Sequence, residues 1–502
     1  YVKMIKIFFN LLIKVIIIYE KLIKAFQANN SIKDQDELLK KLINKSIKTQ
    51  FGKDHNFSII KNYSDYKNRV PIRDYEDFSN YINQIKSGKK NILWPGLPIY
   101  FAKTSGTTSG TKYIPITRNS IPNQINSAKK MLFNYIKLKK SVDILNGKVL
   151  FLSGSPKLES INNIYVGRLS GIVNHHKPFL LKHIYLPSNK TNLINNWEEK
   201  INKIADETLG KDLRVIGGIP PWLQMYFDVL RNKTGKKIKD IFPNLKLICH
   251  GGVNFEPYRA NLFDTIGSEI DTLETFPASE GFFAYQNNLE KNDLILQTNS
   301  GIFYEFISID NIKNKNPKRI TLKNVEIHKN YAMIITTNAG LWSYNLGDTI
   351  KFTSLNPYKI ILTGRTKQYI SAFGEHVIVE EVDKALVETC KSFKEVKVIE
   401  YTVGPKIENN NQKSHHQWLI EFETEPKNLY DFEKELDLNL QKLNPYYKDL
   451  IQDKVLTTLE IKTLKKKSFI NFMKSIGKLG GQNKVPRISN NRKVINEILK
   501  SN

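Results

Sequence analysis

The residues with the most evident chemistry form one short run of hydroxyl side chains, glycines and a lysine. Residues 104–112 read TSGTTSGTK, which places six hydroxyls, two glycines and one lysine within nine positions. Glycines let backbone N–H groups approach an anion closely, hydroxyls donate further hydrogen bonds, and a lysine adds a positive charge. These are the components of a phosphate-binding loop. Its members are Thr104, Ser105, Gly106, Thr107, Thr108, Ser109, Gly110, Thr111 and Lys112.

The spacing within this loop differs from that of the P-loop motif G-x-x-x-x-G-K-[ST]. The fifth residue after Gly106 is Thr111, where that motif requires its second glycine. A Ser/Thr-rich surface turn is the competing interpretation. The hydroxyls, glycines and lysine stand directly before the apolar residues 113–116, and this combination favours phosphate binding.

The composition indicates a folded chain rather than a basic binding protein. The 502 residues are 40% apolar and 11% aromatic, enough for the cores of two or three domains. The formal net charge of +27 comes mostly from lysines spread along the chain, whereas nucleic-acid surfaces favour clustered arginines. Two cysteines, Cys249 and Cys390, are too few for a disulfide framework and fit a reducing compartment. We therefore predict a cytoplasmic chain with no nucleic-acid partner.

The first 26 residues combine apolar and basic side chains at helical spacing. Lys6, Lys14, Glu20 and Lys21 interrupt the apolar positions, so the stretch fits neither a signal peptide nor a spanning helix of about 20 apolar residues. The pattern predicts an amphipathic helix packed on the main domain. Binding at a membrane surface is the alternative, and stable membrane insertion is not expected.

The elements that must position the loop follow an α/β pattern from residue 148 onward. Short apolar runs that end in small residues alternate with helical stretches, which predicts largely parallel sheets covered on both faces. Ligands of such sheets bind at the carboxyl ends of the strands. The predicted strands are 148–154, 213–219, 245–252 and 271–279, and the helices between them include 220–231 and 256–267.

Two further regions complete the predicted architecture. Residues 293–353 carry hairpin-like apolar runs separated by Asn- and Gly-containing turns, which predicts a β-barrel-like part. Beyond them, alternating helices and strands predict a compact α+β unit. We expect an N-terminal domain over 1–364, with residues 1–100 mostly helical, and a mobile C-terminal domain over 365–502.

The hydroxyl-rich loop resembles the phosphate-binding loop of the acyl-adenylate-forming enzymes. More specifically, it is similar to that of the Gretchen Hagen family of acyl-acid-amido synthetases, known from auxin-responsive plant proteins and with bacterial relatives. Residues 51–78 and five later stretches agree with this family, in its order. The later stretches are GGVNFEPYR (251–259), TFPASEG (275–281), SYNLGD (343–348), LTGRTKQYISAFGEHVIVEEVDKAL (362–386) and GGQNKVPR (480–487).

The resemblance implies a large adenylation domain, a small C-terminal α+β domain and an ATP- and Mg²⁺-dependent ligase. Such an enzyme converts a carboxylic acid into an acyl-adenylate, releases pyrophosphate and passes the acyl group to an amine, usually that of an amino acid. The expected partners are therefore a small carboxylic acid and an amino acid, bound by a monomer. Transfer to a thiol, as in an acyl-CoA ligase, is one alternative. A non-catalytic basic protein with this fold is the other.

The family pattern also implies roles for residues of the loop and of the TFPASEG stretch. Residues 105–112, with Lys112 as a candidate catalytic residue, would hold the β- and γ-phosphates. Glu280 would bind Mg²⁺, since a carboxylate suits a hard cation; a charge at the N-terminus of a helix is the structural alternative. Phe276 stands where the family usually has tyrosine. The residues implied near the nucleotide and the acyl carboxylate are Thr275, Phe276 and Ser279.

Four further roles come from the later motifs. Asp348 would accept hydrogen bonds from the ribose hydroxyls, as an acceptor-only side chain can, and an Asx turn after Gly347 is the alternative. Arg365 matches a hinge arginine that contacts ribose or phosphate, although a surface arginine is an equal alternative. Lys484 matches the lysine that reaches into the site during adenylation. The residues implied to line the adenine slot are Gly251, Gly252 and Val253, which could otherwise be an ordinary strand end.

Overall fold

The computed structural model describes most of the chain. The described residues are 31–105, 111–176, 183–252, 255–312, 314, 316–366, 369–370, 375, 377–406, 414–452, 456–479, 484–489 and 492–500. The expected N-terminal amphipathic helix lies outside them, as do Val253 and the loop residues Gly106, Thr107, Thr108, Ser109 and Gly110. No helix within these ranges is long and apolar enough to cross a membrane.

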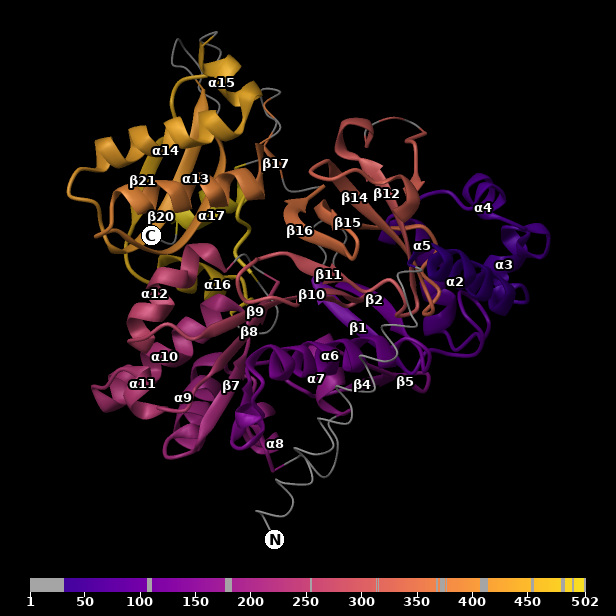
Figure 1. Cartoon of the computed structure of the whole chain (residues 1–502), viewed down its shortest axis with the longest axis horizontal. Coiled ribbons are helices and arrows are strands. Elements are labelled where there is room, and N and C mark those ends of the chain that lie inside the picture. Colours follow the sequence, from indigo (N-terminus) through magenta and orange to yellow (C-terminus); the bar gives the residue numbers. More distant parts are fainter. Residues whose placement is uncertain are drawn as a thin grey trace.

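One large sheet organises the N-terminal part of the molecule (Figure 1). Its twelve described strands run in the order β13-β12-β14-β15-β16-β11-β10-β9-β8-β7-β3-β6. The strands β6, β3, β7, β8 and β9 pair in parallel. Their bounds are Tyr185–Leu186, Lys148–Phe151, Leu213–Gly217, Leu247–Gly251 and Asp271–Ala278.

The remaining strands of this sheet pair antiparallel. They are β10 (Gly281–Gln286), β11 (Leu294–Leu296), β12 (Ile302–Ser308), β13 (Ile320–Thr321), β14 (Asn330–Thr337), β15 (Tyr344–Leu355) and β16 (Tyr358–Arg365). The predicted hairpin region is therefore present, but its strands extend the parallel half into one sheet. Within this large sheet, parallel pairing is confined to the β6–β9 half.

Helices cover both faces of the parallel half. On one face, α6 (Ile121–Lys139) packs Met131 and Tyr135 against Leu247 and Leu273. The other face carries α9 (Trp197–Thr208), α10 (Pro220–Thr234), α11 (Ile238–Ile241) and α12 (Glu256–Ile266) (Figure 1). Burial on both faces explains the continuous apolar runs of these strands.

A second sheet and a group of N-terminal helices flank the main sheet. The sheet order is β2 (Thr111–Ile116), β1 (Tyr100–Ser105), β5 (Ile164–Gly167) and β4 (Glu159–Ile161). The helices are α2 (Ser31–Ser46), α3 (Gln50–Asp54), α4 (Tyr63–Arg69), α5 (Tyr75–Lys86), α7 (Leu169–Asn174) and α8 (Asn189–Asn192). Helix α5 begins after Asp74, whose N–H donates to the Asp77 carboxylate at 3.0 Å.

The C-terminal part has its own sheet, with β20 (His415–Thr424) between β19 (Lys397–Lys406) and β21 (Glu460–Leu464). One apolar cluster joins it to α13 (Val379–Ser392), α14 (Leu429–Leu443) and α15 (Pro445–Gln452). A second cluster joins it to α16 (Ser468–Ser475) and α17 (Lys493–Lys500). The short strands β17 (Tyr369–Ile370) and β18 (Val377–Ile378) pair with each other. The prediction of an α/β chain with a large N-terminal and a smaller C-terminal α+β part is confirmed.

Candidate active site

Residues from five motifs that lie apart in the sequence form one charged cluster beside the carboxyl ends of β8 and β9. The Asp348 carboxylate lies 2.9 Å from Nε of Arg365. Lys484 interacts electrostatically with both. Glu280 interacts electrostatically with Asp348, Arg365 and Lys112. The fold thus gathers five of the residues to which the sequence assigned chemistry.

Asp348 and Arg365 are held together by strand register. They are paired positions on β15 and β16, and Gly347 turns the chain at a φ of 84° just before Asp348. Burial raises the pKa of Asp348, while Arg365 and Lys484 oppose that shift. A buried carboxylate faced by two cations can accept hydrogen bonds from hydroxyl groups of a ligand.

Lys484 reaches from the C-terminal part of the chain to the end of β8. Its ammonium group donates to the carbonyl of Gly252, which adopts a φ of 78°. The residue is exposed, although surrounding protein atoms partly desolvate its ammonium group. This desolvation lowers the pKa of Lys484 to about 8, with Arg365 acting in the same direction and Asp348 against it.

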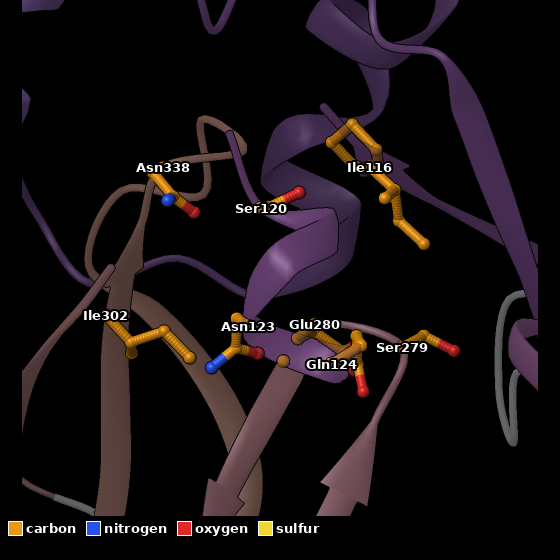
Figure 2. A pocket seen from close by; sticks show the side chains of 10 residues that line it. Ile116, Ser120, Asn123, Gln124, Ser279, Glu280, Ile302 and Asn338 are labelled. Atoms are coloured by element: carbon orange, nitrogen blue, oxygen red, sulfur yellow. The ribbon is translucent and has the colours of Figure 1, made fainter. Parts of the chain in front are cut away.

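Glu280 sits in the tight turn between β9 and β10, and α6 holds that turn in place. Asn123 accepts a hydrogen bond from the Phe282 N–H at 2.6 Å, and Gln124 donates to the Ala278 carbonyl at 2.8 Å. These two contacts bracket Glu280. Figure 2 shows the pocket that results, lined among others by Ser120, Ser279 and Glu280.

The surroundings of Glu280 include a residue that sequence reasoning missed. Tyr344 donates its phenol to Oε1 of Glu280 at 3.3 Å. Burial raises the pKa of Glu280, and nearby Asp348 adds to that shift, whereas Arg365 and Lys112 oppose it. Tyr344 belongs to the same SYNLGD stretch as Asp348, so its place in that motif was the available signal.

The hydroxyl-rich loop connects β1 to β2. Thr104 is paired with Lys112, and Ser105 with Thr111, at the end of this hairpin where the loop connects the two strands. The Lys112 ammonium lies 5.5 Å from the centre of the Tyr75 ring, and the Tyr75 hydroxyl accepts the Tyr113 N–H at 2.8 Å. The structure therefore describes the two ends of the loop and Lys112, whose ammonium group interacts electrostatically with Glu280.

The ends of β8 and β9 lie side by side next to Lys484. Gly251 is paired with Thr275, and a side chain at Gly251 would put its Cβ 2.4 Å from the Thr275 carbonyl oxygen. The Thr275 hydroxyl donates to the His250 carbonyl at 2.9 Å. Phe276 lies in the core, its ring 5.0 Å from that of Phe283. The side chain of Phe276 is thus not part of the charged cluster.

The side chains of the site fit a nucleotide bound together with a magnesium ion. Cations at Lys112, Arg365 and Lys484 surround the carboxylates of Glu280 and Asp348. Within the described ranges, no group of three or more His, Cys, Asp or Glu side chains could hold a metal ion. Mg²⁺ is commonly bound through one or two carboxylates and the phosphates of its substrate. A single carboxylate at Glu280 is compatible with that mode.

Comparisons with known proteins agree with the sequence resemblance. The chain matches the GH3 family N-terminal domain over residues 23–270, the central domain over 295–365 and the C-terminal domain over 380–493. It is 21% identical to a jasmonoyl–L-amino acid synthetase of Nicotiana attenuata, over 66% of this chain and 69% of that protein. It is also 21% identical to an indole-3-acetic acid-amido synthetase of Arabidopsis thaliana, over 93% of this chain and 92% of that protein.

Solved structures share the fold over nearly the whole chain. The GH3.15 acyl acid amido synthetase superposes with a TM-score of 0.78 at 16% identity, covering 96% of this chain and 95% of its own. A 2-hydroxyisobutyryl-CoA ligase in complex with 2-HIB-AMP gives a TM-score of 0.60 at 12% identity, over 93% of this chain and 91% of its own. The three matched family domains follow one another along the chain, and it belongs to the GH3 family, whose relatives here are acyl acid amido synthetases.

Proposed function

We propose that this protein is an ATP-dependent acyl-acid amido synthetase. The observation that carries the proposal is the cluster of Glu280, Asp348, Arg365 and Lys484. These residues come from motifs that lie far apart in the sequence, and they meet beside the phosphate-loop hairpin. The names of the GH3 relatives, which are amido synthetases for jasmonate and indole-3-acetic acid, support the same activity.

The first step is attack by a substrate carboxylate oxygen on the α-phosphorus of ATP. A P–O bond forms, and the bond to pyrophosphate breaks. Negative charge increases around the phosphorus, so fixed cations stabilise the transition state. Lys484 supplies one such cation, and Lys112 with the loop 105–112 holds the β- and γ-phosphates. Mg²⁺, held by Glu280 and phosphate oxygens, would neutralise further charge.

The nucleoside part of ATP is assigned to the same charged cluster. Asp348 accepts hydrogen bonds from the ribose hydroxyls, and Arg365 orients Asp348 and adds positive charge near the ribose or phosphate. Gly251, Gly252 and Val253 are assigned to the border of the adenine site. Thr275, Phe276 and Ser279 belong to the strand and turn that face the nucleotide and the acyl carboxylate.

The second step transfers the acyl group to an amine. The amine nitrogen attacks the carbonyl carbon of the acyl-adenylate, AMP leaves, and the nitrogen loses a proton to give an amide. The acceptor is an amino acid, as in the names of the relatives. We infer that one chain suffices, because the charged cluster is assembled by a single chain. The free thiols of Cys249 and Cys390 support a cytoplasmic location.

We also propose a division of the chain into two domains. We place the boundary after residue 364, so that Arg365 begins a C-terminal domain that carries Lys484. Support comes from the main sheet, whose last strand β16 ends at Arg365, and from the separate sheet of β19, β20 and β21.

The test is pyrophosphate release from ATP and Mg²⁺ across a panel of aliphatic, aromatic and indole-type carboxylic acids. Hydroxylamine traps an acyl-adenylate as a hydroxamate, and parallel reactions contain single amino acids or coenzyme A. Acid-dependent release with an amide product is the expected result. A thioester product that requires coenzyme A and ignores amino acids would contradict amide synthesis. Binding of DNA or anionic vesicles with no ATP chemistry would contradict the enzyme as a whole.

A further inference from the structure

Two residues of the motifs named in the sequence analysis have no role in the function proposed above. Tyr258 belongs to the GGVNFEPYR stretch and Arg487 to the GGQNKVPR stretch. Both side chains are buried, and they meet where α12 contacts β19. We call Tyr258, Glu400, Tyr401 and Arg487 the junction cluster. It joins the N-terminal part of the chain to the part that carries Lys484.

The junction cluster is held by charge-assisted hydrogen bonds. The Arg487 guanidinium pairs with the Glu400 carboxylate and donates to the Tyr258 hydroxyl. The Tyr258 hydroxyl in turn donates to Oε2 of Glu400 at 2.8 Å. The guanidinium nitrogen that pairs with Glu400 also donates to the Tyr401 carbonyl at 3.1 Å. The Arg487 guanidinium, the Glu400 carboxylate and the Tyr258 hydroxyl therefore each contact the other two.

Two aromatic rings enclose the guanidinium. Its central carbon lies 4.5 Å from the centre of the Tyr401 ring and 5.2 Å from that of Tyr258. Burial raises the pKa of the Tyr258 phenol, and Arg487 opposes the shift. Removing one partner of a buried pair leaves the other charge without compensation, which is costly. The arrangement is therefore stable only when α12, β19 and Arg487 are in contact.

The backbone beside Arg487 is fixed to β19. Val403 donates its N–H to the Arg487 carbonyl at 3.0 Å, and the Ser489 N–H returns a bond to the Val403 carbonyl at 2.9 Å. The Thr402 hydroxyl donates to the Pro486 carbonyl at 2.6 Å. Residues 486–489 thus run along the edge of β19. Lys484 precedes this fixed stretch by two residues.

The other anchor of Lys484 lies on the opposite side of the junction. Its ammonium group contacts the Gly252 carbonyl, and Gly252 lies a few residues before α12, which carries Tyr258. The junction cluster therefore sets the separation between the backbone of residues 484–489 and the end of β8. Another polar contact crosses the same junction, the ion pair of Lys397 with Asp264 at 2.8 Å. Because this pair is exposed, it is expected to contribute little to the stability of the junction.

We propose that Tyr258 and Arg487 are positioning residues for adenylation. Their buried contact docks residues 484–489 on α12 and so places the ammonium group of Lys484 at Gly252, next to Asp348. Neither residue touches the reacting atoms. This inference rests on the proposed function, because it takes Lys484 to be the lysine that acts in acyl-adenylate formation.

The test uses Tyr258→Phe in the full chain. This change keeps the ring and its packing and removes only the hydroxyl that joins Arg487 to Glu400. We expect kcat for acid-dependent pyrophosphate release to fall by about tenfold or more, as for loss of a buried hydrogen bond to a charged group. The KM for ATP is expected to stay unchanged, since Asp348 and Arg365 are intact. In a Lys484→Ala background, Tyr258→Phe is expected to add no further loss.

The matched control is Lys397→Ala, which removes an exposed ion pair between the same two elements, α12 and β19. Its kcat and thermal midpoint are expected to match those of the wild type. A wild-type kcat in Tyr258→Phe would overturn the proposal. So would an equal loss in the presence and absence of the Lys484 side chain, because Tyr258 would then act through another group.

A second readout separates failure of this inference from failure of the proposed function. Amide hydrogen exchange of residues 484–489 and of Val403 needs no substrate. We expect faster exchange in Tyr258→Phe than in Lys397→Ala, even if no acid in the panel releases pyrophosphate. Unchanged exchange at Val403 and Ser489 would overturn the docking role, whatever the activity of the wild type.

Discussion

Lys484 is the residue on which the chemistry of adenylation depends most. Lys484→Ala is expected to slow acyl-adenylate formation while leaving ATP affinity nearly unchanged, since its ammonium group acts on charge that develops in the transition state. Pyrophosphate release gives the rate and calorimetry gives the affinity. An equal loss in both would mean that Lys484 serves ground-state binding instead.

The same residue predicts a pH dependence. Desolvation lowers the pKa of Lys484 to about 8, so its positive charge is present below that pH and is lost above it. In the free enzyme, kcat/KM for acid-dependent pyrophosphate release is expected to fall as pH rises through about 8. The Lys484→Ala variant should lack this descending limb. A limb that persists in the variant would assign the titration to another group.

Asp348 is expected to matter for nucleotide binding. Asp348→Ala removes the proposed ribose acceptor and also leaves Arg365 without its partner at 2.9 Å. We expect ATP affinity to fall, because a charged hydrogen bond contributes about 1.5–3 kcal/mol. Calorimetry of ATP binding is the measurement. Wild-type affinity in this variant would refute the ribose assignment.

Burial of His250 on strand β8 predicts that the fold loses stability at acidic pH. Burial lowers the pKa of His250 to about 3, and Arg259 adds to the shift. In the unfolded chain, the His250 imidazole binds a proton below its ordinary pKa of about 6.5. The contribution of neutral His250 to the free energy of unfolding is therefore fully present above that pH and is lost progressively on acidification. From pH 7 to pH 5 the decline is about 2 kcal/mol for this group. Urea unfolding should show a correspondingly smaller decline in His250→Gln, and equal declines would contradict the assignment.

At the scale of elements, the end of β8 places a strict requirement on the backbone at Gly252. Gly252 adopts a φ of 78°, and a Cβ there would lie 2.6 Å from Nζ of Lys484. Gly252→Ala is expected to displace Lys484 and to lower the adenylation rate. Gly235→Ala is the matched control, because Gly235 has a φ of 70° and no atom within 4 Å of its Cβ position. Both variants should lose stability, but only the first should lose activity, and similar rates would argue against the contact.

Most of the individual elements could be predicted from local sequence pattern. The runs beginning at 148, 213 and 271 form strands β3, β7 and β9, and 220–231 lies within α10. Their apolar continuity and flanking small residues are local signals. The way in which the hairpin region joins the parallel strands was not predictable, since the pairing of β11 with β16 brings together residues far apart in the sequence.

The candidate site was predictable to the extent that it lies in motifs. Glu280, Asp348, Arg365 and Lys484 were named from sequence, and the fold brings them together. The contact of Tyr344 with Glu280 and the junction cluster were missed. Both depend on tertiary packing between distant segments, which periodicity and spacing along the chain do not encode.

At the scale of the whole molecule, the site is divided between two parts of one chain. The N-terminal part contributes the hairpin loop, the Glu280 turn and Asp348, and the C-terminal part contributes Lys484. In Figure 1 the C-terminal sheet and its helices lie next to α12. Catalysis by such a site requires the two parts to be held in register, which makes their junction as important as the reactive groups.

The proposed reaction begins with attack of a carboxylate oxygen on the α-phosphorus of ATP, and the fate of that oxygen distinguishes this route from other modes of activation. An acid that supports pyrophosphate release is prepared with ¹⁸O in both carboxyl oxygens and is incubated with ATP, Mg²⁺ and an amino acid. Mass spectrometry of the products is then expected to find one labelled oxygen in AMP and the other in the amide. Label in inorganic phosphate together with ADP, or unlabelled AMP beside labelled amide, would contradict activation through an acyl-adenylate.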